Sequence, residues 1–149
     1  MMYMHHESAI EGPCVCTSLR KAGRAVSRLY DEALEGAGLT TPQFAILRTI
    51  GRAGSVALSR LADALVMDRT SLYRSLDLLE RHGWVAIAAS DTGRTKTVAL
   101  TDAGRAVIDE GAERWEQVQA GLVERIGAEN WEALQALLRD VTEQAEAAR

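Results

Sequence analysis

Cysteine, proline and aromatic residues are scarce in this chain of 149 residues, which contains two Cys, two Pro, three Trp, three Tyr and one Phe. Two cysteines cannot form the disulfide framework of a small secreted domain. The chain also lacks an apolar run of bilayer length and a secretory signal segment, so we expect a cytoplasmic protein without a membrane partner. It lacks a P-loop, a nucleophile elbow and a metal triad, so we predict no enzyme and no cofactor.

Leu, Ala, Arg and Glu are abundant instead, and these residues favour helix. A net charge of −4 is unfavourable for binding a polyanionic partner, but the charge is unevenly distributed along the chain. Residues 102–149 carry eleven acidic and five basic side chains, whereas residues 59–101 carry five acidic and six basic. The acidic surface is therefore concentrated in the C-terminal third, and the middle of the chain can present a local basic surface.

Apolar residues recur at steps of three and four in six segments, and one short β-hairpin interrupts them. Residues 1–13 lack this periodicity and are expected to form a flexible arm, followed by one domain over 14–149. Thr41 is the expected N-cap of the second helix, with Pro42 in its first turn. The predicted order is helices at 17–36, 42–50, 58–65 and 68–82, strands at 84–88 and 95–100, and two long helices within 101–148, divided at Gly127.

The two short helices joined at Val66-Met67 predict a helix-turn-helix within residues 42–100. Leu72, Leu76 and Leu79 form the expected buried side of its second helix. The polar residues between them then face outward, near a helix start that Asp68 can cap. A helix of this kind fits the major groove of DNA, and the following hairpin would direct Arg94 and Lys96 towards phosphates or the minor groove.

Two segments resemble the MarR family of winged helix-turn-helix transcriptional regulators: LSRLADALVMDRTSLYRSLDLLERHGWV at 58–85 and DTGRTKTVALTDAG at 91–104. The resemblance implies a mainly α fold with a small β-hairpin wing, flanked by N- and C-terminal dimerisation helices. Asp91 stands three residues before Arg94, where the family more often has an aspartate two residues before its wing arginine. The residues expected to contact double-stranded DNA are Arg69, Thr70, Ser71, Tyr73, Arg74, Arg94 and Lys96.

The apolar stripes of segments 17–36 and 101–148 exceed what a winged-helix core can cover, so we expect them to form a homodimer interface. Two-fold symmetry then matches a palindromic operator. The resemblance further implies a repressor that an effector releases from DNA. The expected effector is a small aromatic or apolar molecule, or a hydroperoxide.

Cys14 and Cys16 are the candidate redox or effector residues. A thiol at a helix start has its thiolate stabilised, and Arg20 and Lys21 add positive charge nearby. Burial as small apolar side chains is the alternative. Combining the cysteines with His5 and His6 gives no standard zinc spacing, so no metal site is predicted.

Two other classes of protein remain compatible with the sequence. One is a winged-helix interaction module that no longer binds DNA. The other is a thiol-dependent enzyme, which would turn over peroxide instead of reacting with it once. Both would keep the same fold, so DNA binding and peroxide consumption are the measurements that separate them from a regulator.

Overall fold

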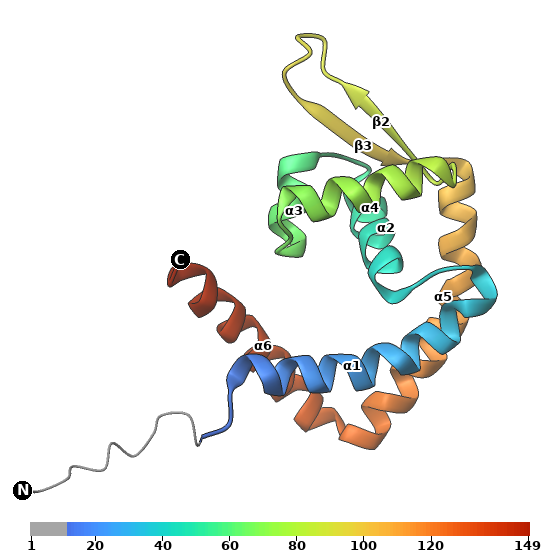
Figure 1. Ribbon diagram of the computed structural model, residues 1–149. Helices are drawn as coiled ribbons and strands as arrows, with labels where there is room; N and C mark the ends of the chain where they lie inside the picture. Colours follow the sequence, from blue (N-terminus) through green and yellow to red (C-terminus); the bar gives the residue numbers. More distant parts are fainter. Residues whose placement is uncertain (1–11) are drawn as a thin grey trace, which may run out of the picture.

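The computed structural model describes residues 12–149, which form six α-helices, one 3₁₀ segment and three strands (Figure 1). In chain order they are α1 (Val15–Leu34), η1 (Glu35–Ala37), α2 (Thr41–Ala53), β1 (Ser55–Ala57), α3 (Leu58–Leu65), α4 (Arg69–Arg81), β2 (Val85–Ala89), β3 (Lys96–Leu100), α5 (Asp102–Ile126) and α6 (Ala128–Ala147). This order confirms the predicted mainly helical fold with a small wing. The predicted arm lies outside the described residues, apart from its last two.

Helices α2, α3 and α4 and the three strands form a lobe, residues 41–100, around one hydrophobic core. The predicted stripe of α4 is confirmed, because Leu72, Leu76 and Leu79 have no exposed surface. Val98 of β3 is equally buried, so the wing is anchored to the same core as the helices. This shared core fixes the orientation of α4 relative to the wing.

The wing belongs to a three-stranded antiparallel sheet in the order β1-β3-β2, where the sequence predicted a two-stranded hairpin. In the additional strand, Val56 pairs with Val98, while on the other side of β3 Ile87 pairs with Val98. Strand β1 has three residues, which is too short for an alternating pattern to be recognised in the sequence. It makes β3 the central strand and holds the base of the wing against α3.

Helix α2 begins one residue earlier than predicted, because Thr40 and not Thr41 is its N-cap. Thr40 forms a capping box with Gln43, each side chain accepting from the other residue's backbone N–H. Thr41 instead donates both its backbone N–H and its hydroxyl to Asp31 Oδ1, each at 2.7 Å. Asp31 lies on α1, so this pair of hydrogen bonds ties the lobe to the first helix.

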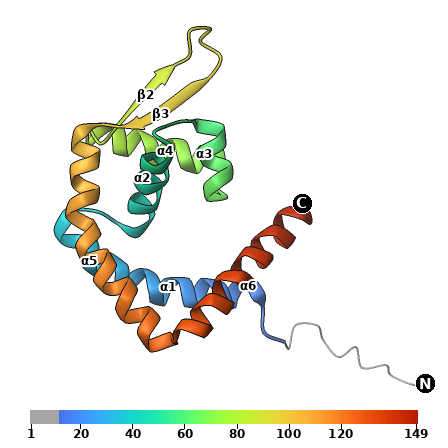
Figure 2. The ribbon, with the colours of Figure 1, turned by 180° about the vertical axis from the view of Figure 1, so that it is seen from behind.

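Helices α1, α5 and α6 form a crescent against which the lobe is set, as the two opposite views show (Figures 1 and 2). Gly127, with φ +94°, ends α5 and turns the chain into α6. Helix α6 has no buried residue, and in α1 only Tyr30 and Leu34 are buried. The apolar stripes predicted for these helices therefore remain largely uncovered within one chain; their exposed members are Val15, Leu19, Val26, Leu29, Leu134, Leu137, Leu138 and Val141. No helix among residues 12–149 is long and apolar enough to cross a membrane.

A cation–π contact joins the lobe to the crescent. The Arg48 guanidinium of α2 lies 4.2 Å from the ring centre of Trp115 on α5 and 5.6 Å from that of Phe44. Partial burial lowers the pKa of Arg48, with repulsion from Arg52 adding to the effect. Trp115 also packs against Tyr30 of α1, whose hydroxyl is hydrogen-bonded to the Gln119 side chain on α5.

Candidate nucleic-acid interface

The start of α4 is held by its N-cap, Asp68, as the sequence predicted. The Asp68 carboxylate accepts from the Ser71 backbone N–H at 2.9 Å and from the Ser71 hydroxyl at 2.7 Å. These two hydrogen bonds lower the pKa of Asp68. The Ser71 proton is thereby committed within the cap, so Ser71 can offer a nucleic acid only the acceptor side of its hydroxyl.

The outward side of α4 carries the other predicted contact residues of this helix. Arg69, Thr70, Tyr73 and Arg74 are all exposed, and they alternate with the buried leucines of the same helix. Arg81, the last residue of α4, continues this exposed side to the end of the helix. A helix with one apolar and one polar, mostly basic side can pack on a core and present donors to DNA at the same time.

The wing ends in a tight turn between β2 and β3. Gly93, at φ +70°, allows its N–H to donate to the Ser90 carbonyl at 2.8 Å, and the Ser90 N–H donates to the Thr95 carbonyl at 2.6 Å. Arg94 and Lys96 project from this region with exposed side chains. Asp91 forms no ion pair with Arg94, since the ion pairs among residues 12–149 join Arg105 to Asp102 and Arg149 to Glu146.

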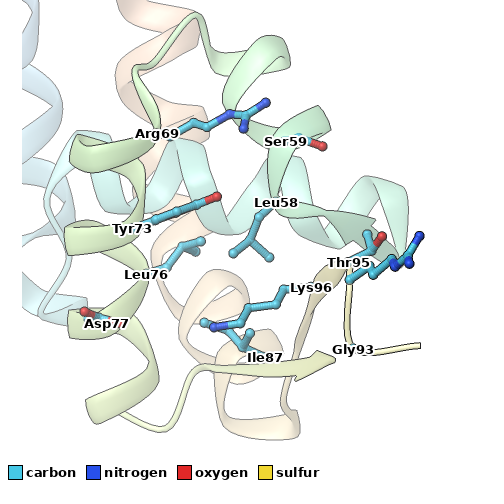
Figure 3. A pocket seen from close by; sticks show the side chains of 11 residues that line it. Leu58, Ser59, Arg69, Tyr73, Leu76, Asp77, Ile87, Gly93, Thr95 and Lys96 are labelled. Carbon is cyan, nitrogen blue, oxygen red and sulfur yellow. The ribbon is translucent and has the colours of Figure 1, made fainter. Parts of the chain in front are cut away.

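Helix α4 and the wing enclose a cleft of about 570 Å³ (Figure 3). Its floor is apolar and includes Leu58, Leu76 and Ile87. Four of the residues predicted to contact DNA line it together: Arg69, Tyr73, Arg94 and Lys96. Side chains that lie 25 residues apart in the sequence are thus brought to one surface, with Tyr73 and Lys96 on facing sides.

The sequence analysis missed three polar residues on this cleft, Ser59 of α3, Asp77 of α4 and Thr95 beside Arg94 on the wing. Asp77 could have been found, because it follows Arg74 by three residues and so lies one turn along the same side of the helix. Ser59 has no comparable signal, because only the packing of α3 against the wing brings it to the cleft.

The two cysteines lie at the far end of the crescent. Cys14 is the N-cap of α1, which begins at Val15, two residues before the predicted start. Both thiols are exposed, against the alternative of burial. Hydrogen bonds from the backbone and then the side chain of Thr17 lower the pKa of the Cys14 thiol. Arg20 and Lys21, expected to stabilise the thiolate, are not among the groups that lower it. Of the proposed metal-binding combination, His5 and His6 lie outside the described residues.

A helix pair whose second member presents a polar, basic side, followed by a β wing on the same cleft, defines a winged helix-turn-helix of the DNA-binding class. The MarR family model matches residues 37–94. The structure of the transcriptional regulator MosR of M. tuberculosis in complex with DNA is 33% identical, with a TM-score of 0.85 and coverage of 92% of this chain and 99% of that one. The chain therefore belongs to the MarR family and is a DNA-binding transcriptional regulator, which is not an enzyme.

Two further relatives show the same likeness. A mutant MarR of E. coli complexed with operator DNA is 26% identical, with a TM-score of 0.77, over 85% of this chain and 91% of that one. The HTH-type transcriptional regulator PecS of Dickeya dadantii (strain 3937) is 26% identical over 133 residues, which is 87% of this chain and 80% of PecS. The likeness thus extends well beyond the helix-turn-helix, into the helices of the crescent.

Proposed function

We propose that this protein is a homodimeric repressor that binds a palindromic operator and leaves it when an effector arrives. The observation that supports this best is the shared cleft, where the basic and polar side chains of α4 meet those of the wing. In this proposal α4 enters the major groove, where Thr70, Ser71 and Arg74 contact bases and Arg69 and Tyr73 contact bases or phosphates. Arg94 and Lys96 hold the flanking backbone.

The uncovered apolar sides of α1 and α6 support the dimer. A 20-residue helix without a fully buried residue gains little from packing within its own chain, so a second copy of the chain is the proposed cover for its apolar side. A two-fold dimer presents two α4 helices, which then meet half-sites about one helical turn apart. A mutant MarR of E. coli, which is similar to this chain, has been crystallised with operator DNA.

Arg74→Ala and Arg94→Ala are expected to weaken DNA binding in different ways. Arg74 lies on the outward side of α4, so its loss should cost about 1–3 kcal/mol at the operator and relax base choice at one position. Arg94 lies on the wing, so its loss should weaken operator and unrelated DNA alike and flatten the salt dependence by about one ion. Gel shifts with selected genomic fragments at two salt concentrations measure both effects.

The matched control is Arg139→Ala, which removes an exposed arginine from α6, a helix that contributes no residue to the lining of the cleft. It should leave binding unchanged. If wild-type protein shifts no fragment at either salt concentration, the chain is an interaction module and not a DNA-binding repressor. If Arg74→Ala binds the operator as tightly as wild type, the assigned side of α4 is wrong.

The effector is proposed to act at Cys14, Cys16 or the contact region between lobe and crescent. The exposed position of both thiols and the lowered pKa of Cys14 favour reaction with a hydroperoxide. A small aromatic or apolar molecule is the alternative effector, and it would act without the thiols. Either one would release DNA by changing the spacing of the two α4 helices.

The lowered pKa of Cys14 predicts that its thiolate persists to lower pH than that of an ordinary thiol. In a Cys16→Ser background, the rate of alkylation by iodoacetamide should therefore reach half its maximum at a pH below that of the unfolded protein. Thr17→Val removes the side-chain donor and should move the midpoint upward. If hydroperoxide releases DNA equally from wild type and from the Cys14→Ser/Cys16→Ser protein, the thiols are not the sensor.

A further inference from the structure

One acidic residue interrupts the polar side of α4. Thr70, Arg74, Asp77 and Arg81 follow each other at steps of four, three and four, so they form one strip along the helix, and all four are exposed. Leu72, Leu76 and Leu79 occupy the buried side. Asp77 thus stands between two arginines, on the strip that the proposed function places in the major groove.

Asp77 is not explained by a contact within the protein. The ion pairs formed by residues 12–149 leave it without a cation within 4 Å. Within the described part of the chain, residues 12–149, the Asp77 carboxylate accepts no hydrogen bond, whereas those of Asp68 and Glu80, the other two acidic residues at this helix, do. Lys96 shares the cleft with Asp77 but makes no ion pair with it (Figure 3).

A free carboxylate on this strip is unfavourable near DNA unless a base donates a hydrogen bond to it. It repels the phosphates, and it forfeits its hydration when α4 enters the groove. An ionised carboxylate can only accept hydrogen bonds, so it is compatible with a base edge that donates and incompatible with the acceptor edges of guanine. Among the bases, cytosine presents an N4 donor in the major groove, which pairs well with Asp.

We propose that Asp77 is a specificity-determining residue, which accepts a hydrogen bond from N4 of a cytosine in each half-site and rejects other bases at that position. The inference rests on the proposed placement of α4 in the major groove. In this proposal, Asp77 determines which base is accepted and does not add affinity. The arginines on either side attract any DNA, while the carboxylate allows tight binding only where cytosine occupies that position.

The test is selection of bound sequences from a random DNA library with wild type, Asp77→Ala and Asp77→Asn. Wild type should prefer cytosine at one position of each half-site by about 5-fold to 150-fold. Asp77→Ala should lose that preference while keeping the rest of the operator, and should bind unrelated DNA about twofold to fivefold more tightly at low salt. Asp77→Asn should shift the preference towards adenine, which an amide recognises.

The charge-matched control is Asp63→Ala, an exposed residue of α3 that lies in a different cleft, beside Met67 and Arg149. It should leave the selected sequence unchanged. Identical selected sequences for wild type and Asp77→Ala would overturn the inference. So would an equal loss of affinity for every DNA, because that result would make Asp77 a residue that positions Arg74 or Arg81. If wild type selects no sequence at all, the proposed function itself fails.

Discussion

Gly104→Ala is expected to destabilise the protein by about 3 kcal/mol and to lower its Tm by about 10 °C. Gly104 lies in the first turn of α5, where a Cβ would stand 2.0 Å from the Trp84 carbonyl oxygen. That oxygen accepts from the Thr101 N–H at 3.0 Å, and Thr101 in turn caps Gly104 at 3.0 Å. The added methyl group must therefore separate the helix start from the wing. Thermal unfolding followed by circular dichroism measures the change.

Gly23→Ala is the matched control, since a Cβ there meets no atom within 4 Å. It is expected to leave the free energy of unfolding unchanged or to raise it by up to about 1 kcal/mol, because alanine favours helix. A Gly104→Ala protein that melts within two degrees of wild type would show that the junction between wing and α5 adjusts freely. The close approach would then not be a constraint on the sequence.

Leu138→Glu is expected to convert the proposed dimer into a monomer. Leu138 lies on the uncovered apolar side of α6 with Leu134 and Val141, each more than one-third exposed. A two-fold interface would contain the new carboxylate twice, and burying two unpaired charges costs several kcal/mol. The dissociation constant should therefore rise by about a thousandfold or more. Sedimentation equilibrium at micromolar concentration should report twice the 16.2 kDa chain mass for wild type and the single mass for the variant.

Ala136→Glu supplies the control for this experiment. Ala136 is exposed on α6, and its helical position places it opposite the side that carries Leu134 and Leu138. The same carboxylate should there leave the dimer intact. A wild-type protein that sediments as a monomer would contradict the dimer, and a dimeric Leu138→Glu protein would place the interface elsewhere.

The helix-turn-helix could be predicted because its signals are local. Leu72, Leu76 and Leu79 repeat at helical spacing, and the caps Asp68 and Thr101 accept from N–H groups three residues later, as a capping side chain must. The structure also explains the glycine that ends the segment 91–104. Gly104 has no Cβ, so α5 can pass close to the Trp84 carbonyl. Such features depend on neighbours in the sequence, so the sequence alone reveals them.

The features that could not be predicted depend on partners far along the chain. Thr41 was taken as a cap because it precedes a proline, but its hydrogen bonds go to Asp31, ten residues earlier on another helix. Strand β1 forms because β3 lies beside it, more than 40 residues later. At the site, Ser59 reaches the cleft only because α3 packs against the wing, and no local pattern in the sequence signals that contact.

The contacts between lobe and crescent differ in how much movement they tolerate. A hydrogen bond such as those from Thr41 to Asp31 fails when its atoms separate beyond about 3.5 Å, so that point acts as a pivot. The attraction of a guanidinium for an aromatic ring persists within about 6 Å of the ring centre, and Arg48 lies 4.2 Å from Trp115. The contact between Arg48 and Trp115 can therefore tolerate a small displacement that would break the hydrogen bonds between Thr41 and Asp31. In the proposed dimer, the stiffness of these contacts would therefore set how far apart the two α4 helices, and so the two operator half-sites, can lie.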